Sequence, residues 1–181
     1  MPKLIIQGQN KLSGSIEVKG TKNLALKIIP ASLLSTEKME ISNVPDIEDT
    51  QRSFEMLKDL GSVIDQNGDK CTINNENVYK TVLSPDIAKK FRASIMFVAP
   101  LLARLGEARF PHPGGCVLGA VSRPIDLFLD GYKSFGAEIK HKDGFYVIKA
   151  KKLKACDFFF TTVSVTATES MMMVASLAEG K

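Results

Sequence analysis

The chain has 181 residues, of which 44% are hydrophobic and 24% are charged, and this composition is typical of a soluble globular protein with one core. No apolar run approaches the roughly 18 residues of a membrane span, and the N-terminus turns polar too soon for a signal peptide. The net charge is +4, but the lysines are scattered, so nucleic-acid binding is not indicated. The charge fits small anionic substrates, and it fits simple solubility equally well.

The cysteines give a further exclusion. Cys71, Cys116 and Cys156 are odd in number and form no C-x-x-C pair. A structural zinc site and a disulfide framework are therefore both poor interpretations, and we expect a reducing cytoplasm.

The first half of the chain reads as a helix, a strand, a second helix and a hairpin. Asn67-Gly68 is a strong turn dipeptide, and Gly61 stands where a helix C-terminus needs a left-handed residue. Pro45 and Asp46 introduce the second helix. The predicted elements are helices over residues 21–34 (despite Pro30) and 47–60, and strands over residues 39–42, 62–65 and 70–73.

The second half repeats this order, with Gly136 in the place of Gly61 and Asp143-Gly144 as the hairpin turn. Because helices and strands alternate, the predicted class is α/β or α+β with layered packing. The predicted elements are helices over residues 87–103 and 124–135, a strand over residues 107–110, and a hairpin around residues 143–144.

An internal repeat runs through the chain. IIPASLLSTEKMEI from Ile28, FVAPLLARLGEARF from Phe97 and MMVASLAEGK from Met172 each read as a helix end, a short turn and a strand start. The third copy has no second half before Lys181, so we expect an incomplete third unit. The second copy carries six additional residues between its strand and its next helix, and they fall in GGCVLGAVS. A glycine-rich insertion in one copy of a repeat is a place where function is expected.

Cys116 lies in this insertion and is the candidate reactive group. Glycines let a backbone approach a ligand closely, and a nearby Arg123 and a helix N-terminus would lower the pKa of the thiol. The alternative interpretation is a cysteine that only packs in the core.

Basic or polar groups open the first helix of each copy. They include Lys22 and Asn23 in the first copy, Lys89, Lys90 and Arg92 in the second, and Thr162 and Ser164 in the third. Helix N-termini attract anions through unpaired N–H groups, so converging helices would place Lys22, Arg92 and Arg123 around an anionic ligand. Taken singly, each residue also fits a solvated surface charge or a simple cap.

Several separated motifs span the chain in order: VKGTKNLALKIIPASLL, RASIMFVAPLLARLG, PGGCVLGA with RPIDL, and VSVTATESMMMVASLAEG. Together they resemble the UDP-N-acetylglucosamine 1-carboxyvinyltransferase family of enolpyruvyl transferases. The resemblance implies an inside-out α/β barrel in two domains, each built from three repeated units. Residues 20–181 would be an incomplete N-terminal domain, and residues 1–19 would be a strand pair that belongs to the C-terminal domain, the missing partner.

The resemblance also implies a reaction. The enolpyruvyl group of phosphoenolpyruvate moves to the 3′-hydroxyl of UDP-N-acetylglucosamine by addition and elimination, with release of phosphate, in the first committed step of peptidoglycan biosynthesis. No cofactor, metal, membrane or nucleic acid is implied. Cys116 matches the loop cysteine that serves as general acid and that fosfomycin alkylates.

The resemblance implies substrate contacts residue by residue. Lys22, Asn23 and Arg123 match contacts to phosphoenolpyruvate. The positions that match contacts to UDP-N-acetylglucosamine are Arg92, Arg123, Pro124, Ile125, Asp126, Leu127, Thr162, Val163, Ser164 and Val165.

The sequence departs from the family pattern at a few positions. Two extra residues separate Cys116 from Arg123, a common lysine is replaced by Thr162, and a common glycine is replaced by Thr166. The family's general base, an aspartate of the second domain, lies beyond this chain.

Three alternatives stay open. A shikimate-pathway enolpyruvyl transferase has no catalytic loop cysteine, so Cys116 and Lys22-Asn23 argue against it. An RNA-cyclase-like protein needs a catalytic histidine, and neither His112 nor His141 has a suitable context. The third alternative is an inactive or binding-only piece of the carboxyvinyltransferase.

Overall fold

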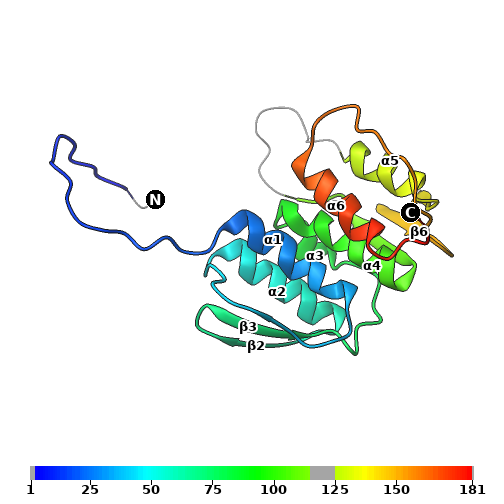
Figure 1. The fold of residues 1–181 in the computed structure, drawn as a ribbon, viewed down its shortest axis with the longest axis horizontal. Coiled ribbons are helices and arrows are strands. Elements are labelled where there is room, and N and C mark those ends of the chain that lie inside the picture. The colour runs from blue at the N-terminus through cyan, green and yellow to red at the C-terminus, as the bar shows by residue number, and fades with distance from the viewer. Residues whose placement is uncertain (1–2, 115–124, 181) are drawn as a thin grey trace.

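The structure is a computed structural model that describes residues 3–114 and 125–180 (Figure 1). Helices and strands alternate along the chain, which confirms the expected mixed class. The elements are α1 (Lys22–Ala31), η1 (Ser32–Leu34), β1 (Met39–Ile41), α2 (Glu48–Leu60), β2 (Val63–Asn67), β3 (Lys70–Asn74), α3 (Pro85–Ala88), η2 (Arg92–Phe97), α4 (Val98–Leu105), β4 (Glu107–Pro111), α5 (Asp126–Ser134), β5 (Glu138–Lys142), β6 (Phe145–Lys149) and α6 (Val165–Ala175), where η marks a 3₁₀ helix.

In the described ranges the strands form two three-stranded antiparallel sheets with the same topology. β3 lies between β1 and β2 in the first sheet, and β6 lies between β4 and β5 in the second. Met39 of β1 is paired with Ile73, and Glu107 of β4 is paired with Lys149. In each copy, the first strand is followed by a helix and then pairs with the hairpin that comes after that helix. The two copies thus build the same sheet, which confirms the internal repeat.

Short parallel bridges join one copy of the repeat to the next. Val82 is paired with Arg109, and Lys154 is paired with Glu179. In both cases the first residue of the pair lies just after the hairpin of one copy. The second residue lies just after the first helical segment of the next copy, where that copy's first strand is expected. Glu179 after α6 thus takes the place that Arg109 takes after α4, and this places the third copy in register with the second.

The two hairpin turns differ in how well the sequence located them. Asp143 and Gly144 are the loop residues of the second hairpin, both with positive φ (52° and 78°), as a type I′ turn requires. The first turn is displaced by one residue from the prediction, because Asn67 is paired with Lys70 and the loop residues are Gly68 and Asp69. Gly68, with a φ of 61°, takes the first loop position.

The prediction of one helix over residues 87–103 is wrong. The segment consists of α3, η2 and α4, and Phe91 between α3 and η2 is extended (φ −147°, ψ 143°). Phe91 is buried there, with its ring edge-on to Phe97 at a centroid distance of 6.4 Å. Pro100 lies in the first turn of α4, where backbone N–H groups have no partner within the helix. Proline's missing N–H therefore costs the helix no hydrogen bond.

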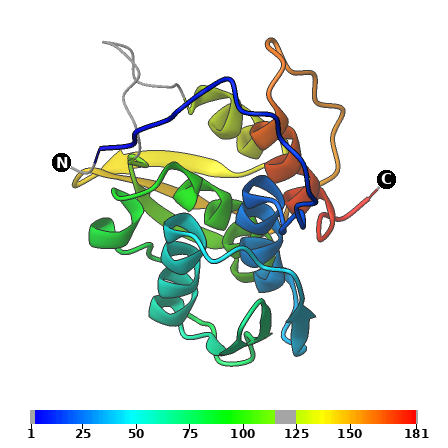
Figure 2. The same ribbon diagram turned by 90° about the vertical axis from the view of Figure 1, so that its left-hand side faces the viewer.

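The helices pack side by side, and their buried side chains contribute to the hydrophobic core. Residues 98–102 of α4 are all buried, and α4 packs against α6 and β4. α1 packs against α2 and η2, and α5 packs against α6. Figure 2 looks nearly along these helices, so they are seen end-on with the sheets around them. In the described part of the chain, no helix has the length and apolar character needed to cross a membrane.

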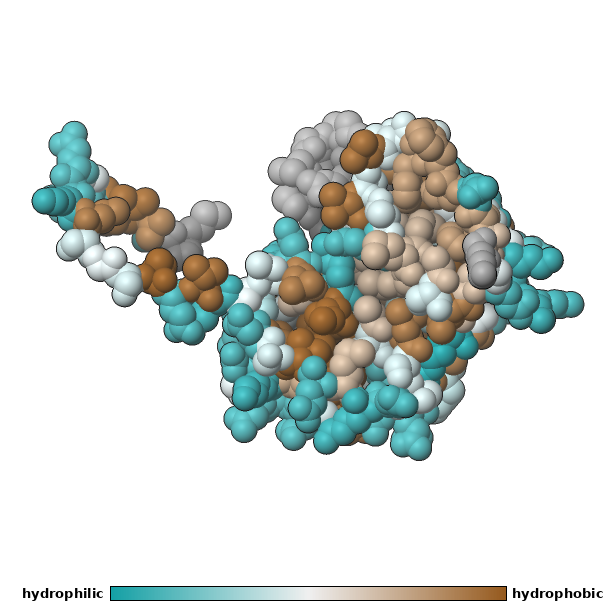
Figure 3. Space-filling model, in the orientation of Figure 1, coloured by the Kyte–Doolittle hydropathy of each residue, from teal (hydrophilic) through white to brown (hydrophobic). Residues whose placement is uncertain are grey.

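Residues 3–19 form an extended segment that leaves the body (Figure 1). No helix or strand is assigned in this segment. Its large apolar side chains are 78–91% exposed, and they give the brown groups on the extended arm in Figure 3. These apolar residues are Leu4, Ile5, Ile6, Leu12, Ile16 and Val18.

Candidate functional site

Several helices begin on one side of the molecule. α1, α2, α5 and α6 all start on the left in Figure 1, and this side faces the viewer in Figure 2. The first N–H groups of a helix have no intrahelical partner, and the helix dipole places partial positive charge at that end. A face on which several helices begin is therefore suited to anionic ligands. We call it the N-terminal face.

The start of α1 is fixed by a close contact with the segment that leads into α2. The Gly20 N–H donates to Asn43 Oδ1 at 3.0 Å, and a Cβ on Gly20 would lie 1.8 Å from the Asn43 carbonyl oxygen. Any side chain at this position would clash with that oxygen, so only glycine fits here. Thr21 then caps the helix, because its Oγ1 accepts a hydrogen bond from the Leu24 N–H at 3.2 Å. Lys22 and Asn23 consequently occupy the first turn of α1 on the N-terminal face.

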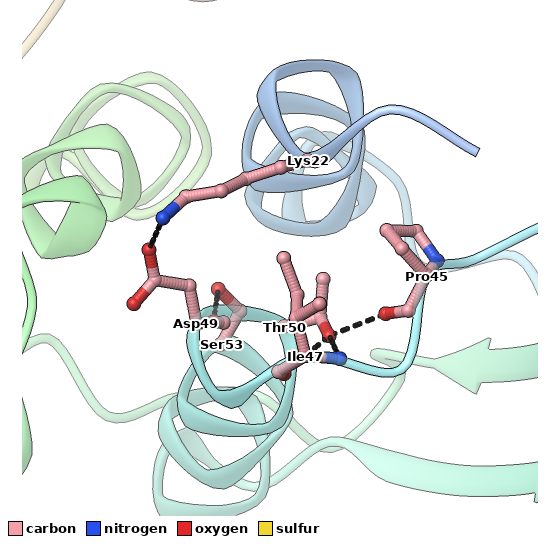
Figure 4. A network of polar contacts seen from close by, with 6 residues as sticks. All are labelled: Lys22, Pro45, Ile47, Asp49, Thr50 and Ser53. Atoms are coloured by element: carbon pink, nitrogen blue, oxygen red, sulfur yellow. Dashed lines mark hydrogen bonds and ion pairs between the residues drawn. The ribbon is translucent and has the colours of Figure 1, made fainter. Parts of the chain in front are cut away.

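Lys22 has a partner that the sequence analysis missed. Its ammonium group forms an ion pair with the carboxylate of Asp49 in the first turn of α2 (Figure 4). The Lys22 side chain is still 55% exposed, whereas that of Asp49 is 30% exposed. The predicted phosphate-binding cation thus lies at the surface of the N-terminal face, next to an acid that is more buried.

Arg92 is the first residue of η2, and its side chain is partly buried. η2 packs against α1, so Arg92 and Lys22 lie on neighbouring elements. The expectation that the helix starts of successive copies surround one anionic ligand stays a prediction.

The third copy contributes the start of α6. Ser164 is its N-cap, and its Oγ accepts a hydrogen bond from the Ala167 N–H at 3.3 Å. Thr162, Val163 and Val165 beside it are exposed, and Val163 is 95% exposed. An ion pair at 3.2 Å between Lys27 and Glu169 joins α1 to α6 just behind these starts. The residues predicted in the first and third copies therefore lie at or just before the starts of two helices that this ion pair joins.

The residues predicted at the start of α5 differ in access. Asp126 is exposed and Leu127 is half-buried. Ile125 is only 3% exposed, so its side chain belongs to the core. Cys116, Arg123 and Pro124 lie outside the described residues.

Gly114 is the last described residue before that gap. Its N–H donates to the Ala88 carbonyl at 3.1 Å, and a Cβ here would lie 1.6 Å from the Lys89 carbonyl oxygen. The chain that leaves β4 is thereby packed against the end of α3, close in sequence to Arg92. Within residues 3–114 and 125–180, no group of His, Cys, Asp or Glu is arranged to hold a metal ion.

Comparisons with known proteins agree with this architecture. The family model described as EPSP synthase (3-phosphoshikimate 1-carboxyvinyltransferase) matches residues 6–181. A crystal structure of the enolpyruvyl transferase NikO from Streptomyces tendae superimposes with a TM-score of 0.77 at 21% identity, covering 96% of this chain and 40% of that one. An EPSP synthase from Acinetobacter baumannii superimposes with a TM-score of 0.71 at 17% identity, covering 92% and 39%. These structures confirm the expected fold.

Curated relatives carry the name that the sequence motifs suggested. A UDP-N-acetylglucosamine 1-carboxyvinyltransferase 1 from Carboxydothermus hydrogenoformans is 43% identical over 180 residues, which are 99% of this chain and 42% of the relative. A UDP-N-acetylglucosamine 1-carboxyvinyltransferase from Geobacter metallireducens is 41% identical over 181 residues, 100% of this chain and 43% of the relative. The chain thus spans less than half the length of these relatives. On the family match and the shared fold, it belongs to the EPSP synthase family of carboxyvinyltransferases.

Proposed function

We propose that the chain is part of an enzyme that transfers the enolpyruvyl group of phosphoenolpyruvate to the 3′-hydroxyl of UDP-N-acetylglucosamine. The observation that carries this proposal is the position of Lys22 and Asn23 in the first turn of α1, on the face where α2, α5 and α6 also begin. Both substrates carry phosphate groups, and cationic side chains at helix N-termini are suited to hold them. Relatives of this name that are 41–43% identical along the chain support the same substrates.

The proposed contacts divide between the two substrates. Lys22, Asn23 and Arg123 hold phosphoenolpyruvate, which carries a phosphate and a carboxylate. Arg92 and the exposed start of α6 hold the diphosphate and uridine of UDP-N-acetylglucosamine, together with the start of α5. The residues proposed for this second substrate are Arg92, Arg123, Pro124, Ile125, Asp126, Leu127, Thr162, Val163, Ser164 and Val165.

In the proposed reaction, the 3′-oxygen of the sugar bonds to C2 of phosphoenolpyruvate while Cys116 delivers a proton to the methylene carbon. The hydroxyl proton goes to a base outside this chain. In the elimination a base takes a proton from the new methyl carbon, the bond from C2 to the phosphate oxygen breaks with release of phosphate, and the double bond is restored. Cations near the phosphate favour the elimination, because they stabilise the charge on the leaving group.

The proposal assigns the complete activity to a longer protein, because the chain spans only 42–43% of these relatives. Residues 1–19 then belong with a C-terminal domain, and the exposed apolar side chains of residues 3–19 support this assignment. Leu24, Ile28 and Met172 also expose apolar surface on α1 and α6, as expected where the rest of a third unit would pack. We propose that the chain alone is inactive or nearly so, and that the enzyme works in the cytoplasm.

A second candidate is transfer to 3-phosphoshikimate, because the matching family model is named for that reaction. The two candidates differ in the acceptor, and binding separates them. We would titrate the 181-residue chain with UDP-N-acetylglucosamine and with 3-phosphoshikimate by calorimetry, and assay phosphate release after adding phosphoenolpyruvate. The full-length relative from Geobacter metallireducens is the positive control.

Binding of UDP-N-acetylglucosamine, with phosphate release far below that of the control, is the expected result. Binding of 3-phosphoshikimate instead would overturn the proposed acceptor. Phosphate release at a rate similar to that of the control would contradict only the claim that the chain alone is inactive.

A further inference from the structure

The ion pair between Lys22 and Asp49 joins the first turns of two helices. Lys22 is the first residue of α1, and Asp49 is the second residue of α2. In Figure 4 the carboxylate of Asp49 points away from its own helix and toward the Lys22 ammonium group. The carboxylate is therefore directed at Lys22 and not at the unpaired N–H groups of α2, where an acid in a first turn is commonly found.

The backbone that carries Asp49 is fixed by its neighbours. Thr50 Oγ1 accepts a hydrogen bond from the Ile47 N–H at 3.3 Å and lies 2.7 Å from the Pro45 carbonyl oxygen, to which it donates. Ser53 Oγ donates to the carbonyl oxygen of Asp49 itself at 2.9 Å. Thr50 and Ser53 are both buried. Asp49 is therefore presented from a rigid helix start, which is what a residue that orients another side chain requires.

Lys22 needs such orientation more than other candidate ligands of an anion do. Its charge lies at the end of a flexible four-carbon stem, and ordering that stem when a ligand binds weakens the binding. An ammonium group has three N–H donors. Pairing one of them with Asp49 orders the stem in advance and leaves the group able to donate to a ligand on the exposed side.

A purely structural role explains the pair poorly. An ion pair with one partner 55% exposed adds little to stability in water. The contact between Gly20 and Asn43 already joins the same two segments. The ion pair therefore acts mainly on the position of the Lys22 side chain and adds little to the stability of the fold.

We infer that Asp49 is a positioning residue that holds the Lys22 ammonium group in place for an anionic substrate. This inference rests on the proposed function, in which Lys22 contacts phosphoenolpyruvate. Asp49 itself does not contact the substrate in this account, and it acts through Lys22.

The test compares Asp49→Asn, Asp49→Glu and the control Asp46→Asn in the 181-residue chain. Asp46 lies three residues earlier, and its carboxylate accepts a hydrogen bond from Gln51 Nε2 at 2.9 Å. Its substitution changes the net charge by the same amount without touching Lys22. Two quantities are measured, the affinity for phosphoenolpyruvate by calorimetry and the ¹⁵Nζ resonance of the Lys22 ammonium group by NMR. That resonance is sharp only when the group is held and exchanges slowly.

We expect Asp49→Asn to broaden the Lys22 resonance and to weaken the binding of phosphoenolpyruvate about five- to tenfold. Asp49→Glu should recover part of both effects, and Asp46→Asn should change affinity less than about twofold. The unfolding midpoint of Asp49→Asn should stay close to that of the unsubstituted chain, which separates positioning from a structural role.

Two results would overturn the inference: an unchanged Lys22 resonance in Asp49→Asn, or binding of phosphoenolpyruvate by Asp49→Asn as tight as by the unsubstituted chain. If the unsubstituted chain does not bind phosphoenolpyruvate at all, binding by this chain alone is refuted, whereas the function proposed for the longer protein is not. The resonance then decides the positioning role alone, because its loss in Asp49→Asn supports the role and its persistence overturns it.

Discussion

The hydroxyl of Tyr132 in α5 lies 2.8 Å from Ser170 Oγ in α6, and both side chains are fully buried. This hydrogen bond joins the second copy of the repeat to the third. Neither group has access to water, so each depends on the other to satisfy its hydrogen-bonding capacity.

Tyr132→Phe should lower the free energy of unfolding by about 1–2 kcal/mol, because it leaves the Ser170 hydroxyl buried without this partner. Urea unfolding followed by circular dichroism measures the change. Tyr79→Phe is the matched control, since Tyr79 is 84% exposed and its hydroxyl can reach water. An equal cost for both substitutions would contradict the importance of the buried contact.

The same tyrosine should make stability depend on alkaline pH. Burial raises the pKa of Tyr132 in the folded chain above the ordinary value of 10.0. Below pH 10 both states keep the proton, whereas at higher pH the unfolded state loses it and the folded state retains it. The free energy of unfolding should then fall by up to about 1.4 kcal/mol per pH unit from this group alone.

Tyr132→Phe lacks this contribution. The difference in unfolding free energy between the unsubstituted chain and Tyr132→Phe should therefore shrink as pH rises above 10, measured by urea unfolding from pH 8 to pH 11. A difference that stays constant over this range would show that Tyr132 ionises as readily in the folded state as in the unfolded one.

The elements that the sequence predicted well are those with strong local signals. Asp143-Gly144 sets its own turn because both residues tolerate positive φ, and the left-handed Gly61 ends α2 where the pattern placed it. The repeat made the second unit predictable from the first. These features depend on neighbours in sequence, which a single chain displays directly.

The missed features depend on side-chain burial and strand pairing, which turn and cap signals in the sequence do not show. The break at Phe91 follows from burying its ring beside Phe97, and the helical periodicity of this segment gives no sign of it. The register of the first hairpin is set by the pairing of Asn67 with Lys70, which moved the turn by one position.

Prediction of the site divides in the same way. The positions of Lys22, Asn23 and Ser164 at helix starts could be predicted because caps and helix starts have sequence signatures, whereas their role in binding stays a prediction. Asp49 could not, since an acid in the first turn of a helix is common and no local pattern pairs it with Lys22, 27 residues earlier.

Gly114→Ala should destabilise the chain by about 1–3 kcal/mol, because the added methyl group meets the Lys89 carbonyl oxygen and the backbone must shift. Thermal unfolding measures the loss. Gly8→Ala is the control, since nothing lies within 4 Å of a Cβ at that position. If Gly114→Ala unfolds at the same temperature as the unsubstituted chain, the close approach to Lys89 is not a constraint in solution.

Alkylation should distinguish the three cysteines. Burial raises the pKa of the Cys71 thiol, and Cys71 is only 3% exposed. Burial and the nearby Asp157 raise the pKa of Cys156, so less of the reactive thiolate is present at neutral pH. Cys116, the proposed general acid, should therefore be alkylated by iodoacetamide and by fosfomycin at least about tenfold faster than either, as measured by peptide mass spectrometry at pH 7.5. Unfolding the chain in urea should remove the difference, because it exposes all three thiols equally. If Cys156 reacts first in the folded chain, Cys116 lacks the access and reactivity expected of a residue that meets the substrate.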